Sequence, residues 1–160
     1  MYYYIDGYNL LFHFLEPKQN LKTLRNQVIA YLQKRFASLH WEGTVVFDGA
    51  HNKEEEGGLT YPSPLIIAYT PKGQTADEYI VEQLNRSKKR RNETVVTNDR
   101  TLILHARSMG AHVLSNQLFI EKLKKKRKKS GTVKEPQETN HQIERLNQIF
   151  EKRLREDSGE

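Results

Sequence analysis

Three aspartates each follow a predicted strand, at positions that could bring their side chains into one crevice. Asp6, Asp48 and Asp99 each closely follow a short run of apolar and β-branched residues, a pattern typical of a buried strand. In a parallel α/β sheet, the carboxyl ends of neighbouring strands open into a common crevice, so we expect these side chains to lie near one another. Crowded carboxylates repel unless a cation or a shared proton relieves them. The pattern therefore favours a site for Mg²⁺ or Mn²⁺, which prefer oxygen ligands.

A fourth acid, Asp77, lies at the predicted start of a helix. Thr75 and Glu78 have the spacing of a capping box, which explains Glu78 without a metal. Asp77 is not needed for that box. It either stabilises the positive end of the helix or faces the crevice as a further ligand. Asp6 and Asp48 each precede a glycine, so an ordinary turn is the alternative for both.

The elements that would position these acids alternate along the chain. Strand-like runs are expected at residues 2–5, 44–47, 65–69, 94–97 and 111–114, with helical spacing of apolar residues between most of them. This order predicts a three-layer α/β/α sandwich with a mostly parallel central sheet. We expect a turn with positive φ at Gly7, then an irregular loop to Pro17. Residues 50–64 are expected to form a long loop, in which His51 has no assigned role.

The chain is expected to contain one main domain, residues 1–129, and a C-terminal extension, residues 130–160. The extension combines a linker with an amphipathic helix that carries Leu146 and Phe150. This helix could pack back on the domain or mediate self-association, and we expect packing or partial disorder rather than a specific partner. The absence of cysteine excludes disulfides and thiolate zinc sites. No apolar run approaches the ~18 residues of a membrane span. We therefore expect no membrane partner, and we expect a cytoplasmic location.

Positive charge is concentrated in two segments. The net charge is +6, yet residues 86–91 hold five basic side chains and residues 122–129 hold seven, and the rest of the chain has more acids than bases. Such blocks favour a polyanion such as nucleic acid, although solvated helix surfaces are the alternative. The residues predicted to bind the substrate backbone are Lys88, Lys89, Arg90, Arg91, Lys124, Lys125, Lys126 and Arg127.

Several other chemistries of α/β proteins lack their motifs here. The sequence contains no glycine-rich dinucleotide fingerprint, no P-loop and no Gly-x-Ser-x-Gly nucleophile elbow. Several carboxylates without a nucleophile favour metal-assisted hydrolysis.

Four segments together resemble a known family. Residues 4–10 (YIDGYNL), 46–48 (VFD), 74–78 (QTADE) and 96–99 (VTND) are similar to the YacP-like branch of the NYN nucleases, within the PIN-like superfamily, over about residues 2–125. Gly49 departs from the pattern, where Ala is often expected. The resemblance implies a PIN-like fold and a Mg²⁺- or Mn²⁺-dependent endoribonuclease. It also implies cleavage of mRNA, which family members can perform in association with the ribosome.

The resemblance also assigns roles to individual residues. Asp6, Asp77 and Asp99 match the metal-binding acids, and Asp48 is an additional catalytic candidate. Asn9 and Asn98 match the polar positions that orient the acids or contact phosphate.

Two other functions stay open from the sequence: a non-catalytic RNA- or ribosome-binding adapter on a nuclease fold, and a toxin-type PIN ribonuclease. Tyr8 and Phe12 could stack on bases of a single strand, with core packing the favoured role for Phe12.

Overall fold

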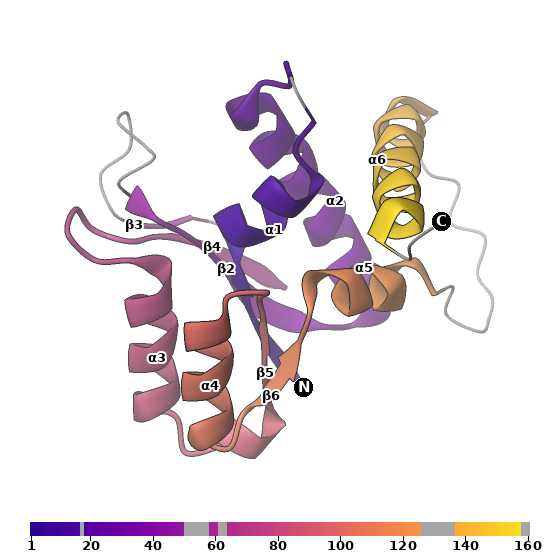
Figure 1. The fold of residues 1–160 in the computed structure, drawn as a ribbon. Helices are drawn as coiled ribbons and strands as arrows, with labels where there is room; N and C mark the ends of the chain where they lie inside the picture. The colour runs from indigo at the N-terminus through magenta and orange to yellow at the C-terminus, as the bar shows by residue number, and fades with distance from the viewer. Residues whose placement is uncertain (17, 50–57, 61–63, 126–136, 158–160) are drawn as a thin grey trace.

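A six-stranded sheet forms the centre of the protein, in the order β3-β4-β2-β1-β5-β6 (Figure 1). All neighbouring strands pair in parallel except β3, which is antiparallel to β4. The computed structural model describes residues 1–16, 18–49, 58–60, 64–125 and 137–157. The strands are β1 (Tyr2–Asp6), β2 (Glu42–Phe47), β3 (Gly58–Thr60), β4 (Leu65–Tyr69), β5 (Glu93–Val96) and β6 (His112–Leu114).

Helices cover both faces of the sheet (Figure 1). Side chains alternate along a strand, so Tyr3 and Ile5 of β1 join the core on one face and Tyr4 joins the core on the other. This arrangement confirms the predicted three-layer sandwich with a mostly parallel sheet. The first face is covered by α1 (Gly7–Phe14), α2 (Leu21–Leu39), α5 (Asn116–Lys124) and α6 (Gln137–Asp157), and the second by α3 (Ala76–Arg86) and α4 (Arg100–Ser108).

The predicted turn and loop after β1 are wrong, because Gly7 begins helix α1. Gly7 is not among the glycines with positive φ, so close packing explains it better than backbone freedom. A Cβ at this position would lie 2.6 Å from ring carbons of Phe47 in β2. The glycine therefore lets α1 start directly against the neighbouring strand.

Strand β3 lies within the segment predicted as a loop, residues 50–64. The rest of that segment up to residue 63, including His51, lies outside the described residues. Gly49, just before it, is also explained by close approach, since a Cβ there would lie 2.0 Å from the carbonyl oxygen of Thr70.

The helix starts follow local signals in the sequence. The side chain of Asn20 caps α2, and Thr75 and Glu78 form the predicted capping box of α3. Asp99, rather than Asn98, caps α4. The side chain of Ser115 caps α5. Each cap satisfies backbone N–H groups that have no partner inside the helix.

Helix α6 packs on the first face of the sandwich. Phe150 is fully buried, with its ring 4.6 Å from the ring of Phe14 in α1 and 5.6 Å from that of Tyr31 in α2. The Tyr31 hydroxyl donates to Asn147 Oδ1 at 3.3 Å. These contacts join α6 to the main core. Among the residues that the structure describes, no helix combines the length and apolar character needed to cross a membrane.

Candidate active site

The register of the central strands places Asp6 at the carboxyl edge of the sheet. Ile5 pairs with Val96 of β5, so Asp6 lies level with Thr97 just beyond that strand. The Thr97 hydroxyl donates to Asp6 Oδ2 at 3.2 Å. Asp6 is only 7% exposed, and a carboxylate is seldom so buried unless a cation or base is paired with it.

Asp77 and Asp99 reach the same edge from two helix starts. Asp77 lies in the first turn of α3. Asp99 is the N-cap of α4, where its Oδ1 accepts a hydrogen bond from the Leu102 N–H at 3.0 Å. Both helices pack on the same face and begin at the carboxyl edge (Figure 1). The positive ends of two helix dipoles therefore also point toward this edge.

The electrostatics of the acids show that they interact. Burial, together with the negative charges of Asp77 and Asp99, raises the pKa of Asp6 to about 7, against the opposing effect of the hydrogen bond from Thr97. Burial also raises the pKa of Asp77, to which the charges of Asp99 and Asp48 contribute. A hydrogen bond with Asp6 and the positive charge of His105 lower the Asp77 pKa. Asp6, Asp77 and Asp99 thus lie within electrostatic reach of one another.

The acids fit a divalent cation by their chemistry. A buried carboxyl whose pKa is raised by two neighbouring carboxylates is stabilised in its charged form by a cation. Within the described ranges, no three histidine or acidic side chains are already arranged as an ion-binding group. Asp48 is half-buried just after β2, and its negative charge contributes to the raised pKa of Asp77.

Asn9 and Asn98 belong to a hydrogen-bonded network beside the acids. Asn9 Oδ1 accepts from the Asn98 N–H at 2.9 Å and from Asn116 Nδ2 at 2.9 Å. The Asn116 N–H in turn donates to Asn98 Oδ1 at 2.9 Å. This network ties α1, the end of β5 and the start of α5 together. It connects Asn9 and Asn98 to each other and, through Thr97, to Asp6.

Asn116 was missed from the sequence. It is fully buried, although it directly follows Ser115, the polar residue that caps α5. No local pattern distinguishes it from an ordinary first-turn residue, since its partners lie 18 and 107 positions away. His105 was missed as well, because nothing in the sequence links α4 to Asp77.

We expect Asn116→Ala to lower the free energy of unfolding by roughly 1–3 kcal/mol, because it removes the hydrogen bonds that the fully buried Asn116 amide donates to Asn9. Urea denaturation of the two proteins measures this. Gln117→Ala, one position along the same helix, is the matched control. Equal stability of the Asn116 variant and the control would contradict a structural role for the network.

Tyr8 and Phe12, the two candidates for stacking on bases, differ in exposure, and the predicted core role of Phe12 is wrong. Tyr8 is in the core at 5% exposure, whereas Phe12, predicted to favour the core, is 48% exposed. The rings are stacked, with centroids 5.8 Å apart and an interplanar angle of 22°. Phe12 is thus the one of the two with a face available at the surface.

Those of the predicted basic residues that the structure describes do not lie beside the acids. Lys88, Lys89, Arg90 and Arg91 lie in the connection between α3 and β5, at the amino-terminal edge of the sheet (Figure 1). Lys124 is occupied elsewhere: its Nζ lies 3.8 Å from Glu151 of α6, and burial lowers its pKa. Lys125 follows at the end of α5, and Lys126 and Arg127 lie outside the described residues.

The family assignment comes from the sequence as a whole. The profile of the family described as YacP-like NYN domain matches residues 3–158. The chain belongs to this family. The match extends beyond residue 125 and includes α6, so the C-terminal helix lies within the region characteristic of YacP-like NYN proteins.

Solved structures agree with this assignment at the level of the fold. Rae1 (YacP) from Bacillus subtilis is similar to this YacP-like chain with a TM-score of 0.59 and 19% identity, over 95% of this chain and 83% of that one. A mutant form of the same protein gives a TM-score of 0.58 and 22% identity, over 100% and 84% of the two chains. No curated protein matches the sequence. The domain therefore has a nuclease-type fold.

Proposed function

We propose that this YacP-like protein is a metal-dependent endoribonuclease that hydrolyses phosphodiester bonds of single-stranded RNA. The observation that carries the proposal is the burial of Asp6 beside Asp77 and Asp99, because burial, and after it the charges of these two acids, raises the pKa of Asp6 to about 7. A fold maintains such repulsion at a cost in stability, which is the pattern expected of a functional site.

The four acids have two roles in the proposal. Asp6, Asp77 and Asp99 hold one or two Mg²⁺ or Mn²⁺ ions, and Asp48 orients the attacking water. When bound, the ion supplies charge stabilisation for the scissile phosphate and makes water more acidic. Thr97 holds the carboxylate of Asp6 in one orientation through its hydroxyl. Asn9 and Asn98 hold the strand ends in register, and the exposed side of Asn98 is available to a phosphate.

The exposed ring of Phe12 supports a single-stranded substrate. It lies one helical turn from Tyr8 and on the same helix as Asn9, whose side chain binds the end of β5. An unpaired base can stack on such a ring, whereas a base within a duplex cannot reach it. We further infer mRNA as the substrate class, with the ribosome as a candidate partner and a cytoplasmic location, from the family to which the chain belongs.

The test is cleavage of a labelled, unstructured RNA by the purified protein. We expect internal cuts with Mn²⁺ or Mg²⁺ and none with EDTA, because the ion supplies the charge stabilisation and the acidic water that hydrolysis requires. Mapping both new ends identifies the bond that is broken. Cleavage that resists the chelator would contradict the proposal, and RNA binding without cleavage in any metal would favour the adapter.

A further inference from the structure

We propose that the amino-terminal edge of the sheet carries a second RNA-binding surface, which holds the phosphodiester backbone independently of the acids. We call it the basic edge. It consists of the connection between α3 and β5 and the adjoining end of α4, with Lys88, Lys89 and Arg91 as its binding cations.

The basic edge is well separated from the acids. Helix α3 carries Asp77 in its first turn and Arg86 in its last. The two are nine positions apart along the helix, which is about 14 Å at 1.5 Å per residue. Since α3 and α4 run the full height of the sheet, the basic edge lies at the opposite end from the acids (Figure 1). A phosphate held there is therefore not the one beside the scissile bond.

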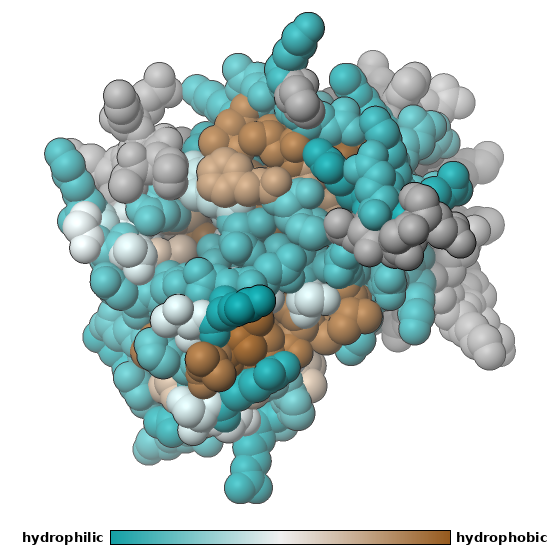
Figure 2. Space-filling view, in the orientation of Figure 1, coloured by the Kyte–Doolittle hydropathy of each residue, from teal (hydrophilic) through white to brown (hydrophobic). Residues whose placement is uncertain are grey.

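The basic edge is hollowed. A pocket of about 850 Å³ is lined by residues 87–92 on one side and by Ser108, Met109 and Gly110 on the other. Lys88, Lys89 and Arg91 are exposed, and no described acidic side chain forms an ion pair with them. Figure 2 shows apolar side chains gathered over α4 and hydrophilic ones projecting below it, at this end of the protein.

Arg90 differs from its neighbours. Its Nε donates to the Leu84 carbonyl at 2.7 Å and its Nη2 donates to the Asn85 carbonyl at 3.0 Å. Arg90 therefore closes the C-terminus of α3, where a cation also compensates the helix dipole. We assign it to the fold and leave it out of the binding surface.

The turn that presents the three cations is held in place. The Ser87 hydroxyl donates to the buried Glu93 carboxylate at 2.8 Å and accepts from the Lys89 N–H at 3.0 Å. The Asn92 N–H donates to the Lys89 carbonyl at 2.8 Å and closes a 3₁₀ turn. Because the backbone is already ordered, binding need only order the ends of the cationic side chains.

The lining favours RNA over an acidic protein. Protein interfaces have an apolar or aromatic centre, and Met109 is the single large apolar side chain lining this pocket. Phosphate contacts use Lys and Arg together with Ser, Asn and backbone N–H groups, which is the composition found here. Such contacts position a nucleic acid without reading its sequence.

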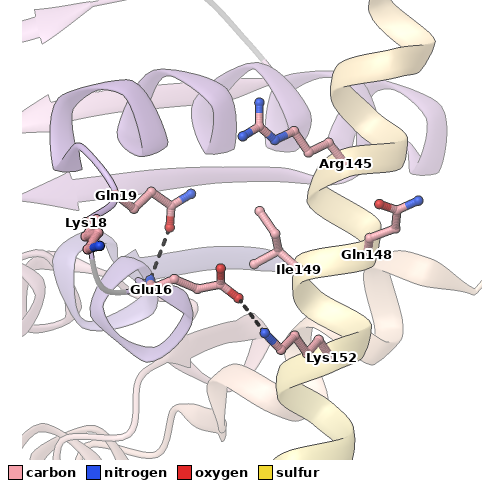
Figure 3. A pocket seen from close by; sticks show the side chains of 7 residues that line it. All are labelled: Glu16, Lys18, Gln19, Arg145, Gln148, Ile149 and Lys152. Carbon is pink, nitrogen blue, oxygen red and sulfur yellow. Dashed lines mark hydrogen bonds and ion pairs between the residues drawn. The ribbon is translucent and has the colours of Figure 1, made fainter.

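The test compares two variants with the same loss of charge. The first is Lys88→Gln, Lys89→Gln and Arg91→Gln, which keeps Arg90. The control is Lys18→Gln, Arg145→Gln and Lys152→Gln, which alters another polar hollow, about 440 Å³, between α6 and the start of α2 (Figure 3). That hollow contains Glu16, which pairs with Lys152 at 3.5 Å, so it is less suited to phosphate.

Binding of a fluorescein-labelled, unstructured 30-nucleotide RNA is measured in EDTA by anisotropy at several salt concentrations, with all proteins also carrying Asp6→Asn. Cleavage plays no part, so a failure here is distinguishable from a failure of the nuclease proposal. Loss of three phosphate contacts reduces the slope of log K against log[salt] by about 2, at ~0.7 per contact on a single strand. We expect that reduction, with roughly tenfold weaker binding at low salt, for the basic-edge variant.

The control variant, with Lys18, Arg145 and Lys152 replaced, should change the slope of log K against log[salt] by less than half as much as the basic-edge variant does. Equal effects of the two variants would show that net charge alone is responsible and would overturn the proposal. An unchanged slope for the basic-edge variant would overturn it as well. Unchanged RNA binding together with lost binding to a polyglutamate probe would assign the surface to an acidic protein partner instead.

Discussion

Replacing Asp6 by Asn is expected to reduce metal-dependent RNA cleavage by at least about 100-fold, because loss even of a group that supports a metal ligand costs 10- to 100-fold. The side chain keeps its size and can still accept the hydrogen bond from Thr97. The folded structure should therefore persist while the charge that attracts a cation is lost. Initial cleavage rates in Mn²⁺ measure the effect, with far-ultraviolet circular dichroism as the check on folding.

Asp99→Asn is the companion variant, and the structure indicates that it removes the charge of Asp99 without disturbing α4. Asp99 caps α4, and Asn caps helices about as well as Asp, so α4 keeps its N-terminal hydrogen bond. Glu144→Gln, an exposed position on α6, removes one negative charge far from the site and should retain full activity. Cleavage at the wild-type rate by both aspartate variants would remove these acids from the reaction.

The second prediction with a large effect concerns how the free energy of unfolding depends on pH when a chelator is present. The folded-state pKa of Asp6 is about 7, above its ordinary value of 3.8, so between these values the folded chain holds a proton that the unfolded chain has released. The contribution of Asp6 to stability therefore falls as the pH rises from 4 to 8. At ~1.4 kcal/mol per pH unit, the contribution of Asp6 is on the order of 4 kcal/mol.

Asp6→Asn removes this dependence. The variant should match the wild type near pH 4 and be more stable than it at pH 8, as measured by urea denaturation in EDTA. Mn²⁺ should raise the melting temperature of the wild type at pH 8, because a ligand that binds only the folded state stabilises it, and should have a smaller effect on the variant. A variant that is less stable than the wild type at pH 8 would contradict the repulsion between the acids.

Much of the architecture could be predicted from the sequence because its signals are local. The strand runs ending near Asp6 and Asp48 and the capping box of Thr75 and Glu78 depend on neighbours within a few residues, and the structure has them where expected. Helix α1 could not be predicted in this way. An isolated helix of 8 residues is not stable in water, and this one depends on packing against β2 and, through Phe14, against Phe150 of α6.

The sequence by itself determined the kinds of residues at the site and the elements that carry them. Only the tertiary structure decided which of them meet. It put Asp6, Asp77 and Asp99 within electrostatic reach of one another, added the buried Asn116, and placed Lys88 and its neighbours at the other end of the sheet. The physical reason is that charge and periodicity are properties of a short segment. Convergence depends instead on strand order and register, which arise when segments far apart in the chain bury their apolar faces together.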